Sequence, residues 1–291
     1  MHQSSHKSRL RAGGSVASAY TPNRSYETGR LTRATVLCLH LGVARSCDYL
    51  LIDISNSYAK FAFASKRRVS APARIATNKL SSNLVAGFLG QREVRKVVVS
   101  SVVPAKKSAI SRAARKKAKV IWLDWKLKLG VKIDYPKPRS IGADRLANAA
   151  AVAELYGFPA IVVDFGTAVT FDIVSERCTY VGGVIAPGLE AMTNFLYQRT
   201  ALLPRLSLEE PRRAVGKSTI EAMLSGAVFG YRGLVREILG RIRAEQFPRK
   251  KVYVVATGGY ARLIAGRLPE IGVVRPHLTL EGLRIVANLN D

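Results

Sequence analysis

"YLLIDISNSYAKFAFAS", residues 49 to 65, is the stretch that decides the fold. An apolar run leads into Asp53, a turn of small polar residues follows, and the chain returns as a second strand-like run that carries Lys60. The pattern predicts a β-hairpin with a carboxylate at its mouth. Two interpretations stay open for this hairpin alone, because Asp53 either caps its own turn or serves a bound ligand.

A second copy of the pattern lies at "AIVVDFGTAVTFDIV", residues 160 to 174. Here too an apolar strand ends in an acid, Asp164, and turns through Gly166 and Thr167 before it returns as a strand. Material of similar size follows each copy, so the pattern indicates two duplicated domains. Two facing hairpins, each with a carboxylate and backbone N–H groups, would form a clamp for a metal-bound polyphosphate.

The chain from residue 49 onward alternates strand-like and helix-like segments, which predicts an α/β fold whose sheets contain antiparallel edges. We expect a basic, disordered N-terminal extension over residues 1–48, a first domain over 49–156 and a second domain over 157–291. Strands are predicted at 49–54, 58–64, 69–76, 96–102, 119–123, 160–165, 168–174, 179–185, 252–256 and 271–274. Helices are predicted at 79–90, 105–117, 143–156, 188–197, 217–245, 260–268 and 279–289.

The composition is that of a globular protein. The chain has 291 residues, of which 48% are hydrophobic, enough for a substantial core. No apolar run reaches the roughly 20 residues that span a bilayer, and the three cysteines show neither metal-ligand spacing nor a disulfide framework. We therefore expect a soluble protein of a reducing compartment, the cytoplasm.

The formal net charge of +26 would by itself favour a polyanion as partner. The densest basic cluster, "KKSAISRAARKKAK" at 106 to 119, predicts a helix with Ala and Ile inward and Lys and Arg outward. A solvated helix face is favoured over a DNA-binding helix, because interleaved aromatic residues and nucleic-acid motifs are missing. The same charge would attract ATP and acidic metabolites.

A Pro-containing loop leads into an Ala-rich helix at "PKPRSIGADRLANAAAVAELYG", with Gly142, Asp144 and Arg145 at its start. An acid in the first helical turn is favoured by the helix macrodipole, so helix capping is one interpretation of Asp144. The other is a general base beside an anion-binding Arg. An alcohol that attacks a phosphoryl group needs a proton acceptor, and a substrate carboxylate needs a basic partner.

Two glycine-containing turns allow weaker inferences. "GKST" at 216 to 219 imitates part of a P-loop, but Pro211 stands where an earlier glycine is required and no apolar strand precedes it. We reject a Walker A motif and predict a helix start capped by Ser218 or Thr219. The Gly-Gly turn at 258–259 would let a flat nucleoside lie against backbone, or is a plain βα turn.

Six stretches of the sequence, taken together and in their order along the chain, resemble the motifs of type III pantothenate kinase. This family is a member of the acetate and sugar kinase, Hsc70 and actin superfamily. The resemblance covers the chain from about residue 49 onward, and it implies two duplicated actin-like (ribonuclease H-like) domains with mixed sheets, flanking helices and an interdomain cleft. The stretches are the Asp53 hairpin, "SSVVP" at 100–104, "GADR" at 142–145, "DFGTAVTFD" at 164–172, "RTALLP" at 199–204 and "GKSTIEAMLSG" at 216–226.

The resemblance implies an enzyme that phosphorylates the primary hydroxyl of pantothenate to 4'-phosphopantothenate, the first step of coenzyme A biosynthesis. The implied cofactors are ATP, Mg²⁺ or another divalent metal, and a monovalent cation, K⁺ or NH₄⁺. A homodimer is implied as well, with neither a membrane nor a nucleic acid as partner.

Residue by residue, the resemblance implies that Asp144 is the catalytic base. Asp164 is implied as the ligand of the monovalent cation, and Asp53 as a residue that approaches the divalent metal through the phosphates. Thr167 is an implied ATP contact, together with a first phosphate-binding loop of Asp53, Ile54, Ser55, Asn56, Ser57, Tyr58, Ala59 and Lys60. The implied substrate-binding residues are Tyr135, Gly142, Ala143, Asp144, Arg145 and Thr219.

The first loop departs from the family pattern Asp-x-Gly-Asn-Thr, because Ser55 replaces the Gly and Ser57 replaces the Thr. Ser57 keeps a hydroxyl. If Ser55 adopts a positive φ, strain on the order of 1 kcal/mol would weaken ATP binding. Two alternatives to the kinase therefore stay open, namely a non-catalytic, basic nucleic-acid-binding relative of the same fold and a kinase for another small alcohol.

Overall fold

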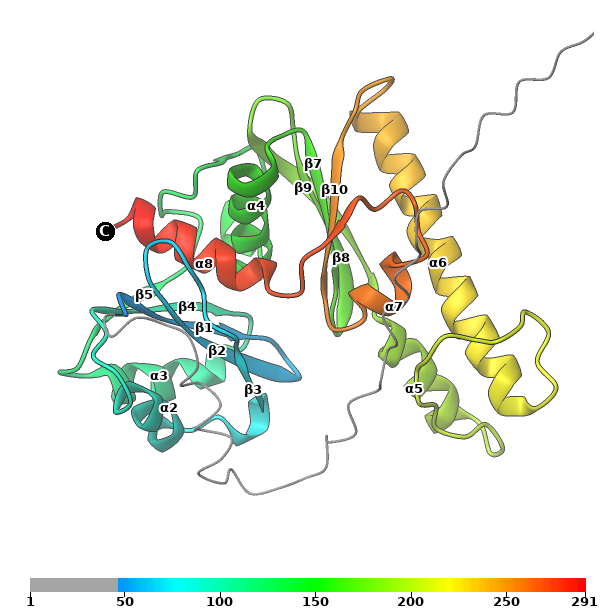
Figure 1. Ribbon diagram of the computed structural model, residues 1–291, viewed down its shortest axis with the longest axis horizontal. Coiled ribbons are helices and arrows are strands. Elements are labelled where there is room, and N and C mark those ends of the chain that lie inside the picture. The colour runs from blue at the N-terminus through cyan, green and yellow to red at the C-terminus, as the bar shows by residue number, and fades with distance from the viewer. Residues whose placement is uncertain (1–46) are drawn as a thin grey trace, which may run out of the picture. The chain divides into compact units, whose positions relative to one another are not determined.

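Two mixed β-sheets with helices on their faces make up residues 47–291, which are the residues that the computed structural model describes (Figure 1). Most of the predicted N-terminal extension, residues 1–46, lies outside the described residues. Among the described residues, no helix combines the length and the apolar character that a bilayer crossing requires.

The first sheet has the strand order β3-β2-β1-β4-β5. Its central strand β1 pairs antiparallel with β2 and parallel with β4. Apolar residues run along β1 without alternation because both faces of this strand are buried. The strands are β1 (Tyr49–Ile54), β2 (Tyr58–Ala64), β3 (Ala73–Ala76), β4 (Lys96–Ser101) and β5 (Lys119–Trp122).

The second sheet repeats this topology in the order β11-β10-β7-β8-β9-β6. β7 pairs antiparallel with β8 and parallel with β10, as β1 does with β2 and β4. Edge strand β6 is the addition to the repeated pattern, so the predicted duplication is confirmed. The strands are β6 (Lys132–Ile133), β7 (Ala160–Phe165), β8 (Ala168–Val174), β9 (Thr179–Pro187), β10 (Tyr253–Gly258) and β11 (Val273–Val274).

Helices bury the faces of both sheets through three hydrophobic clusters. α2 and α3 pack on one face of the first sheet, and α4 and α8 pack on its other face. α4 also contacts β7 and β8 of the second sheet, which α6 and α7 cover (Figure 1). The helices are α2 (Ser82–Leu89), α3 (Lys107–Ala114), α4 (Ala143–Tyr156), α5 (Leu189–Arg199), α6 (Thr219–Gln246), α7 (Ala261–Ala265) and α8 (Leu278–Leu289).

α4 and α8 cross at close range. A Cβ at Gly282 of α8 would overlap the carbonyl oxygen of Ala147 on α4, so a glycine is required at this crossing. At the far end of α8, the hydroxyl of Tyr49 on β1 donates a hydrogen bond to Asn288 Oδ1 at 3.0 Å. These contacts fix α4, whose first turn carries predicted site residues, against both sheets.

Several predicted bounds are wrong by a few residues. β3 begins at Ala73 rather than at 69, because Pro72 has no N–H to donate to the ladder. α3 ends at Ala114 rather than at 117, since the chain turns at Lys116 with a φ of +63°. The sequence pattern did not predict β6, which has two residues and pairs with β9 alone.

Candidate active site

Two carboxylates occupy equivalent positions in the two sheets. Asp53 on β1 pairs in register with Lys60 on β2, and Asp164 on β7 pairs with Thr170 on β8. On the other side of each acid, the parallel strand carries a hydroxyl-bearing residue in register. The duplicated topology therefore places one acid near the end of the central strand of each sheet.

The tips of the two hairpins touch each other. Ser57 Oγ in the first hairpin lies 3.0 Å from Thr167 Oγ1 in the second. Gly188, just before α5, donates its N–H to the carbonyl oxygen of Thr167 at 3.1 Å, and a Cβ at Gly188 would overlap the loop carbonyls. The structure thus brings together two predicted ATP contacts that lie more than a hundred residues apart.

The loop conformation at Ser55 decides whether this residue strains the first loop. Ser55 donates its N–H to the carbonyl oxygen of Tyr58 at 3.0 Å and accepts a 2.7 Å hydrogen bond from Thr77 Oγ1 at its own carbonyl. Its φ is not positive, so the condition for left-handed strain at Ser55 is not met. The described residues other than glycine with a positive φ are Lys116, Cys178 and Arg249.

Asp53 is buried with little compensating charge. Its side chain is 3% exposed, and Lys60 Nζ lies 4.0 Å from its Oδ2. Its Oδ1 is buried and has no hydrogen-bond partner among the described residues. Burial raises the pKa of Asp53 to about 7; the charge of Lys60 opposes this shift, and those of Asp144 and Asp164 add to it. The three predicted acids therefore share one electrostatic site.

A buried polar chain holds the second acid. Asn148 Nδ2 on α4 donates to Asp164 Oδ2 at 3.2 Å, and Thr279 Oγ1 on α8 donates to Asn148 Oδ1 at 2.9 Å. Burial raises the pKa of Asp164, whereas the charge of Lys60 lowers it. Gly258 has a φ of +94° and packs closely against the acid, since a Cβ there would lie 2.6 Å from Asp164 Oδ1. The carboxylate is thus fixed in position.

Asp144 lies in the first turn of α4, where Gly142 is the N-cap and supplies no side-chain hydrogen bond. A Cβ at Gly142 would overlap Asp144 Oδ1, which accepts the N–H of Arg145 at 2.9 Å. Burial raises the pKa of Asp144, and the charge of Asp164 adds to the shift. A raised pKa suits a carboxylate that accepts a proton near neutral pH.

Arg145 turns its guanidinium onto the second sheet. Its Nε donates to Asp172 Oδ1 at 2.6 Å, and the hydroxyl of Tyr180 donates to the same oxygen at 3.2 Å. The rings of Tyr135 and Tyr180 meet edge to face, with 6.3 Å between their centroids. Burial raises the pKa of Asp172 to about 7, while the charge of Arg145 opposes the shift. Two predicted substrate residues, Tyr135 and Arg145, therefore belong to one cluster.

The other predicted residues are placed less uniformly. The side chains of Ile54 and Ala59 are buried in the hairpin, so these residues offer a ligand their backbone alone. Tyr58 is 40% exposed and lies under the guanidinium of Arg74, whose central carbon is 3.5 Å from the ring centroid. Thr219 is exposed at the first turn of α6, and no side-chain hydrogen bond joins it to another predicted residue in the described chain.

Four polar residues around the acids had no assigned role in the sequence analysis. The sequence contained a signal for Asp172, because an acid inside an apolar strand needs a buried polar partner. Tyr180 is one such partner. The sequence contained no comparable signal for Asn148 and Thr279, since polar residues are common in helices. The four residues are Asn148, Asp172, Tyr180 and Thr279.

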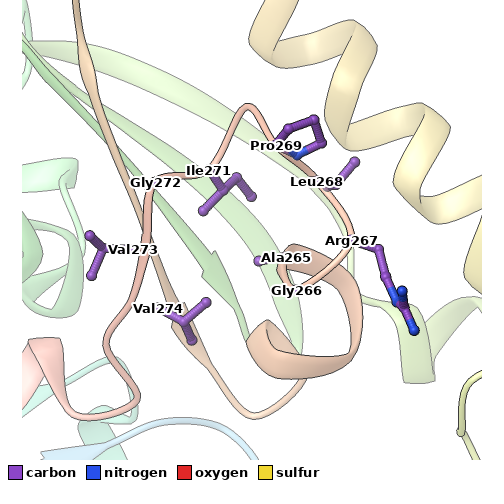
Figure 2. A pocket seen from close by; sticks show the side chains of 9 residues that line it. All are labelled: Ala265, Gly266, Arg267, Leu268, Pro269, Ile271, Gly272, Val273 and Val274. Atoms are coloured by element: carbon purple, nitrogen blue, oxygen red, sulfur yellow. The ribbon is translucent and has the colours of Figure 1, made fainter. Parts of the chain in front are cut away.

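A pocket of about 430 Å³ lies apart from these residues in the sequence, beside α7 and β11 (Figure 2). It is lined by residues between 265 and 274, which are mostly small or apolar apart from Arg267. None of the predicted site residues lines it. The candidate site is therefore defined by the carboxylates and the hairpin tips rather than by this pocket.

The raised pKa of Asp53 predicts a pH-dependent stability of the ligand-free protein. Its folded-state pKa of about 7 exceeds the unfolded value, so the associated stability is present below about pH 4 and is lost as the pH rises through 7. We expect Asp53→Asn to raise the free energy of unfolding by on the order of 2–4 kcal/mol at pH 8 and by little at pH 4. Urea unfolding at both pH values measures this.

The exposed Asp124 provides the matched control, and Asp124→Asn should show no such difference between the two pH values. An equal effect of Asp53→Asn at pH 4 and pH 8 would contradict the assignment of a strongly raised pKa.

The sequence of this chain is similar to those of known proteins over most of its length. A family model described as type III pantothenate kinase matches residues 49–241. The type III pantothenate kinase of Akkermansia muciniphila is 50% identical over 244 residues, covering 83% of this chain and 99% of that protein. That of Methylacidiphilum infernorum is 40% identical over 240 residues, covering 82% and 88%.

Solved structures share the fold at lower identity. A Campylobacter jejuni protein described as a Baf family transcriptional activator superimposes with a TM-score of 0.55 at 21% identity, covering 83% of this chain and 98% of that one. A Sinorhizobium meliloti protein described as a 2-dehydro-3-deoxygalactonokinase gives 0.55 at 16%, covering 82% and 96%. The predicted actin-like fold class is confirmed, and on the sequence matches the chain belongs to the type III pantothenate kinase family.

Proposed function

We propose that this chain transfers the terminal phosphoryl group of ATP to the primary hydroxyl of pantothenate, giving 4'-phosphopantothenate in the first step of coenzyme A biosynthesis. Membership of a kinase family implies ATP and a divalent metal as cofactors. The observation that carries the proposal is the contact between the two hairpin tips, each of which follows a strand that carries an acid, Asp53 or Asp164. A cytoplasmic location fits such a biosynthetic step.

The hairpin tips would bind the phosphates of ATP. The hydroxyls of Ser57 and Thr167 and the N–H groups of the two loops suit phosphate oxygens. A divalent cation bound with the nucleotide supplies neutralisation of the phosphate charge. Asp53 fits such a cation, because its Oδ1 is a buried acceptor without a partner. Among the described residues no group of three or more acidic, His or Cys side chains could hold a metal, so phosphate oxygens would complete its shell.

Asp164 would hold the monovalent cation, K⁺ or NH₄⁺. The residues present fit a cation there, since the carboxylate is fixed by Asn148 and its burial disfavours an uncompensated negative charge. The positive charge of Lys60 lowers the pKa of both Asp53 and Asp164 and would stabilise their ionised forms beside the phosphates.

Asp144 would accept the proton of the attacking hydroxyl. Its Oδ1 is engaged by the N–H of Arg145, which leaves Oδ2 for the substrate. Arg145 and Tyr135 would bind the carboxylate end of pantothenate, with Gly142 and Ala143 shaping the turn between base and guanidinium. Thr219 stays a predicted substrate contact.

The two alternative functions have weaker support. The nucleic-acid-binding alternative was motivated by the net charge of +26 and by Ser55, and Ser55 does not have a positive φ. The presence of Asp53, Asp144, Asp164 and Thr167 together favours the kinase. A kinase for another small alcohol would use the same base and phosphate loops. A panel of small alcohols, assayed beside pantothenate, separates that case from ours.

Asp144→Asn tests the proposed base. We expect turnover, measured as pantothenate-dependent ADP release, to fall by about 100-fold or more, because the hydroxyl loses its proton acceptor. Nucleotide affinity should stay within about threefold, since Asp144 is assigned to the substrate and not to ATP. Asp124→Asn serves as the control and should keep the wild-type rate. Retention of that rate by Asp144→Asn would refute the assignment.

A second copy of the chain would cover the apolar face of α5 and the start of α6. Phe195 on α5 exposes 58% of its surface, and Leu202 in the loop that follows α5 exposes 88%. Exposed apolar side chains of this size are typical of interaction sites where they are contiguous. The proposed partner is an identical chain, as the family resemblance implies. Other exposed apolar residues of these segments are Met192, Leu196 and Tyr197 on α5 and Ile220 at the start of α6.

Light scattering on the purified chain tests the homodimer. We expect the mass of two chains for the wild type and of one chain for Phe195→Glu, because a charge would be buried in the contact. Leu155→Glu, at an exposed apolar residue of α4, is the matched control and should remain a dimer. A wild type that stays monomeric at high concentration would overturn the proposal.

A further inference from the structure

Arg145 is paired at Nε and unpaired at Nη2 among the described residues. Its Nε donates to Asp172 Oδ1 at 2.6 Å, and its side chain is 12% exposed. Its Nη2 is buried and has no hydrogen-bond partner among the described residues. A buried guanidinium N–H without an acceptor costs free energy of folding. A bound ligand that accepts a hydrogen bond from Nη2 would remove this cost.

The surroundings of Arg145 leave its guanidinium little freedom. Asp172 is fully buried on β8, and the hydroxyl of Tyr180 on β9 donates to the same Asp172 oxygen that Arg145 uses. A Cβ at Gly183 on β9 would overlap both Arg145 Nη2 and the carbonyl oxygen of Phe171. A glycine at 183 therefore gives the guanidinium the room in which Asp172 and Tyr180 hold it.

We propose that Asp172 and Tyr180 are positioning residues, which hold Arg145 through its Nε so that Nη2 donates to the carboxylate of the substrate. The inference rests on the proposed function. In it, Asp172 and Tyr180 set the preference of the enzyme for an alcohol that carries a carboxylate. A guanidinium that is already held at Nε loses less conformational freedom when another of its nitrogen atoms binds a carboxylate. Asp172 and Tyr180 act through Arg145 and contact neither reactant.

A purely structural role for Asp172 predicts a different result. If the ion pair only ties α4 to β8, its loss should lower stability and should affect the binding of every ligand alike. If it positions Arg145, the loss should fall on the carboxylate of pantothenate. Pantothenol, in which a hydroxymethyl group replaces that carboxylate, separates the two cases.

The experiment compares the full-length wild type with Asp172→Asn. We expect the KM for pantothenate to rise by about tenfold or more, because the ion pair that holds Arg145 becomes a weaker hydrogen bond to an uncharged amide. The KM for ATP and kcat should stay within about threefold, and so should the inhibition constant of pantothenol measured in competition with pantothenate. Tyr180→Phe, which removes one hydroxyl and keeps the ion pair, should raise the pantothenate KM by a few-fold in the same selective way.

Glu210→Gln is the matched control, since Glu210 makes a two-point ion pair with Arg232 away from the predicted site residues. It should leave all of these constants unchanged. A pantothenate KM within threefold of the wild type in folded Asp172→Asn would overturn the inference, as would an equal weakening of pantothenol. If Asp172→Asn does not fold, Tyr180→Phe decides: an unchanged pantothenate KM, or an equal change in the inhibition constant of pantothenol, would overturn the inference. A wild type without pantothenate-dependent turnover would instead refute the proposed function.

Discussion

Two buried carboxylates and two half-buried ones, with too little positive charge around them, are the constraint on which the rest of the structure depends. Burial raises the pKa of each, because a low-dielectric environment disfavours the charged form. Lys60 and Arg145 supply the main opposing charge, and neither neutralises the whole group. Such a cluster costs folding free energy, and a nucleotide with its cations would offset that cost. The acids are Asp53, Asp144, Asp164 and Asp172.

The fold meets this constraint by duplication and by one shared helix. Each sheet has a hairpin whose first strand carries an acid, and the two hairpin tips meet through Ser57 and Thr167. α4 packs against both sheets, and its first two turns carry the proposed base Asp144, the guanidinium of Arg145 and the amide of Asn148. A single rigid element therefore sets the distances among base, substrate anchor and cation site, which is what phosphoryl transfer by positioning requires.

Local patterns in the sequence predicted the hairpins at their observed bounds, because apolar runs broken by small polar residues admit few other structures. They also placed Asp144 in the first turn of a helix. The partners of the acids were not predictable in this way, since the Thr279–Asn148 bond joins residues 131 positions apart. Asp172 stood inside a quoted motif without a role, because its partner lies on another element. Ser55 carries no positive φ, which composition alone does not reveal.

A crystal structure with a non-hydrolysable ATP analogue, Mg²⁺ and pantothenate tests the central claim most directly. Our account predicts the terminal phosphate beside the hairpin tips at Ser57 and Thr167, with the primary hydroxyl of pantothenate about 2.6–3.2 Å from Asp144 Oδ2. A nucleotide bound elsewhere, for example in the pocket beside Arg267, or a hydroxyl out of reach of Asp144, would contradict it.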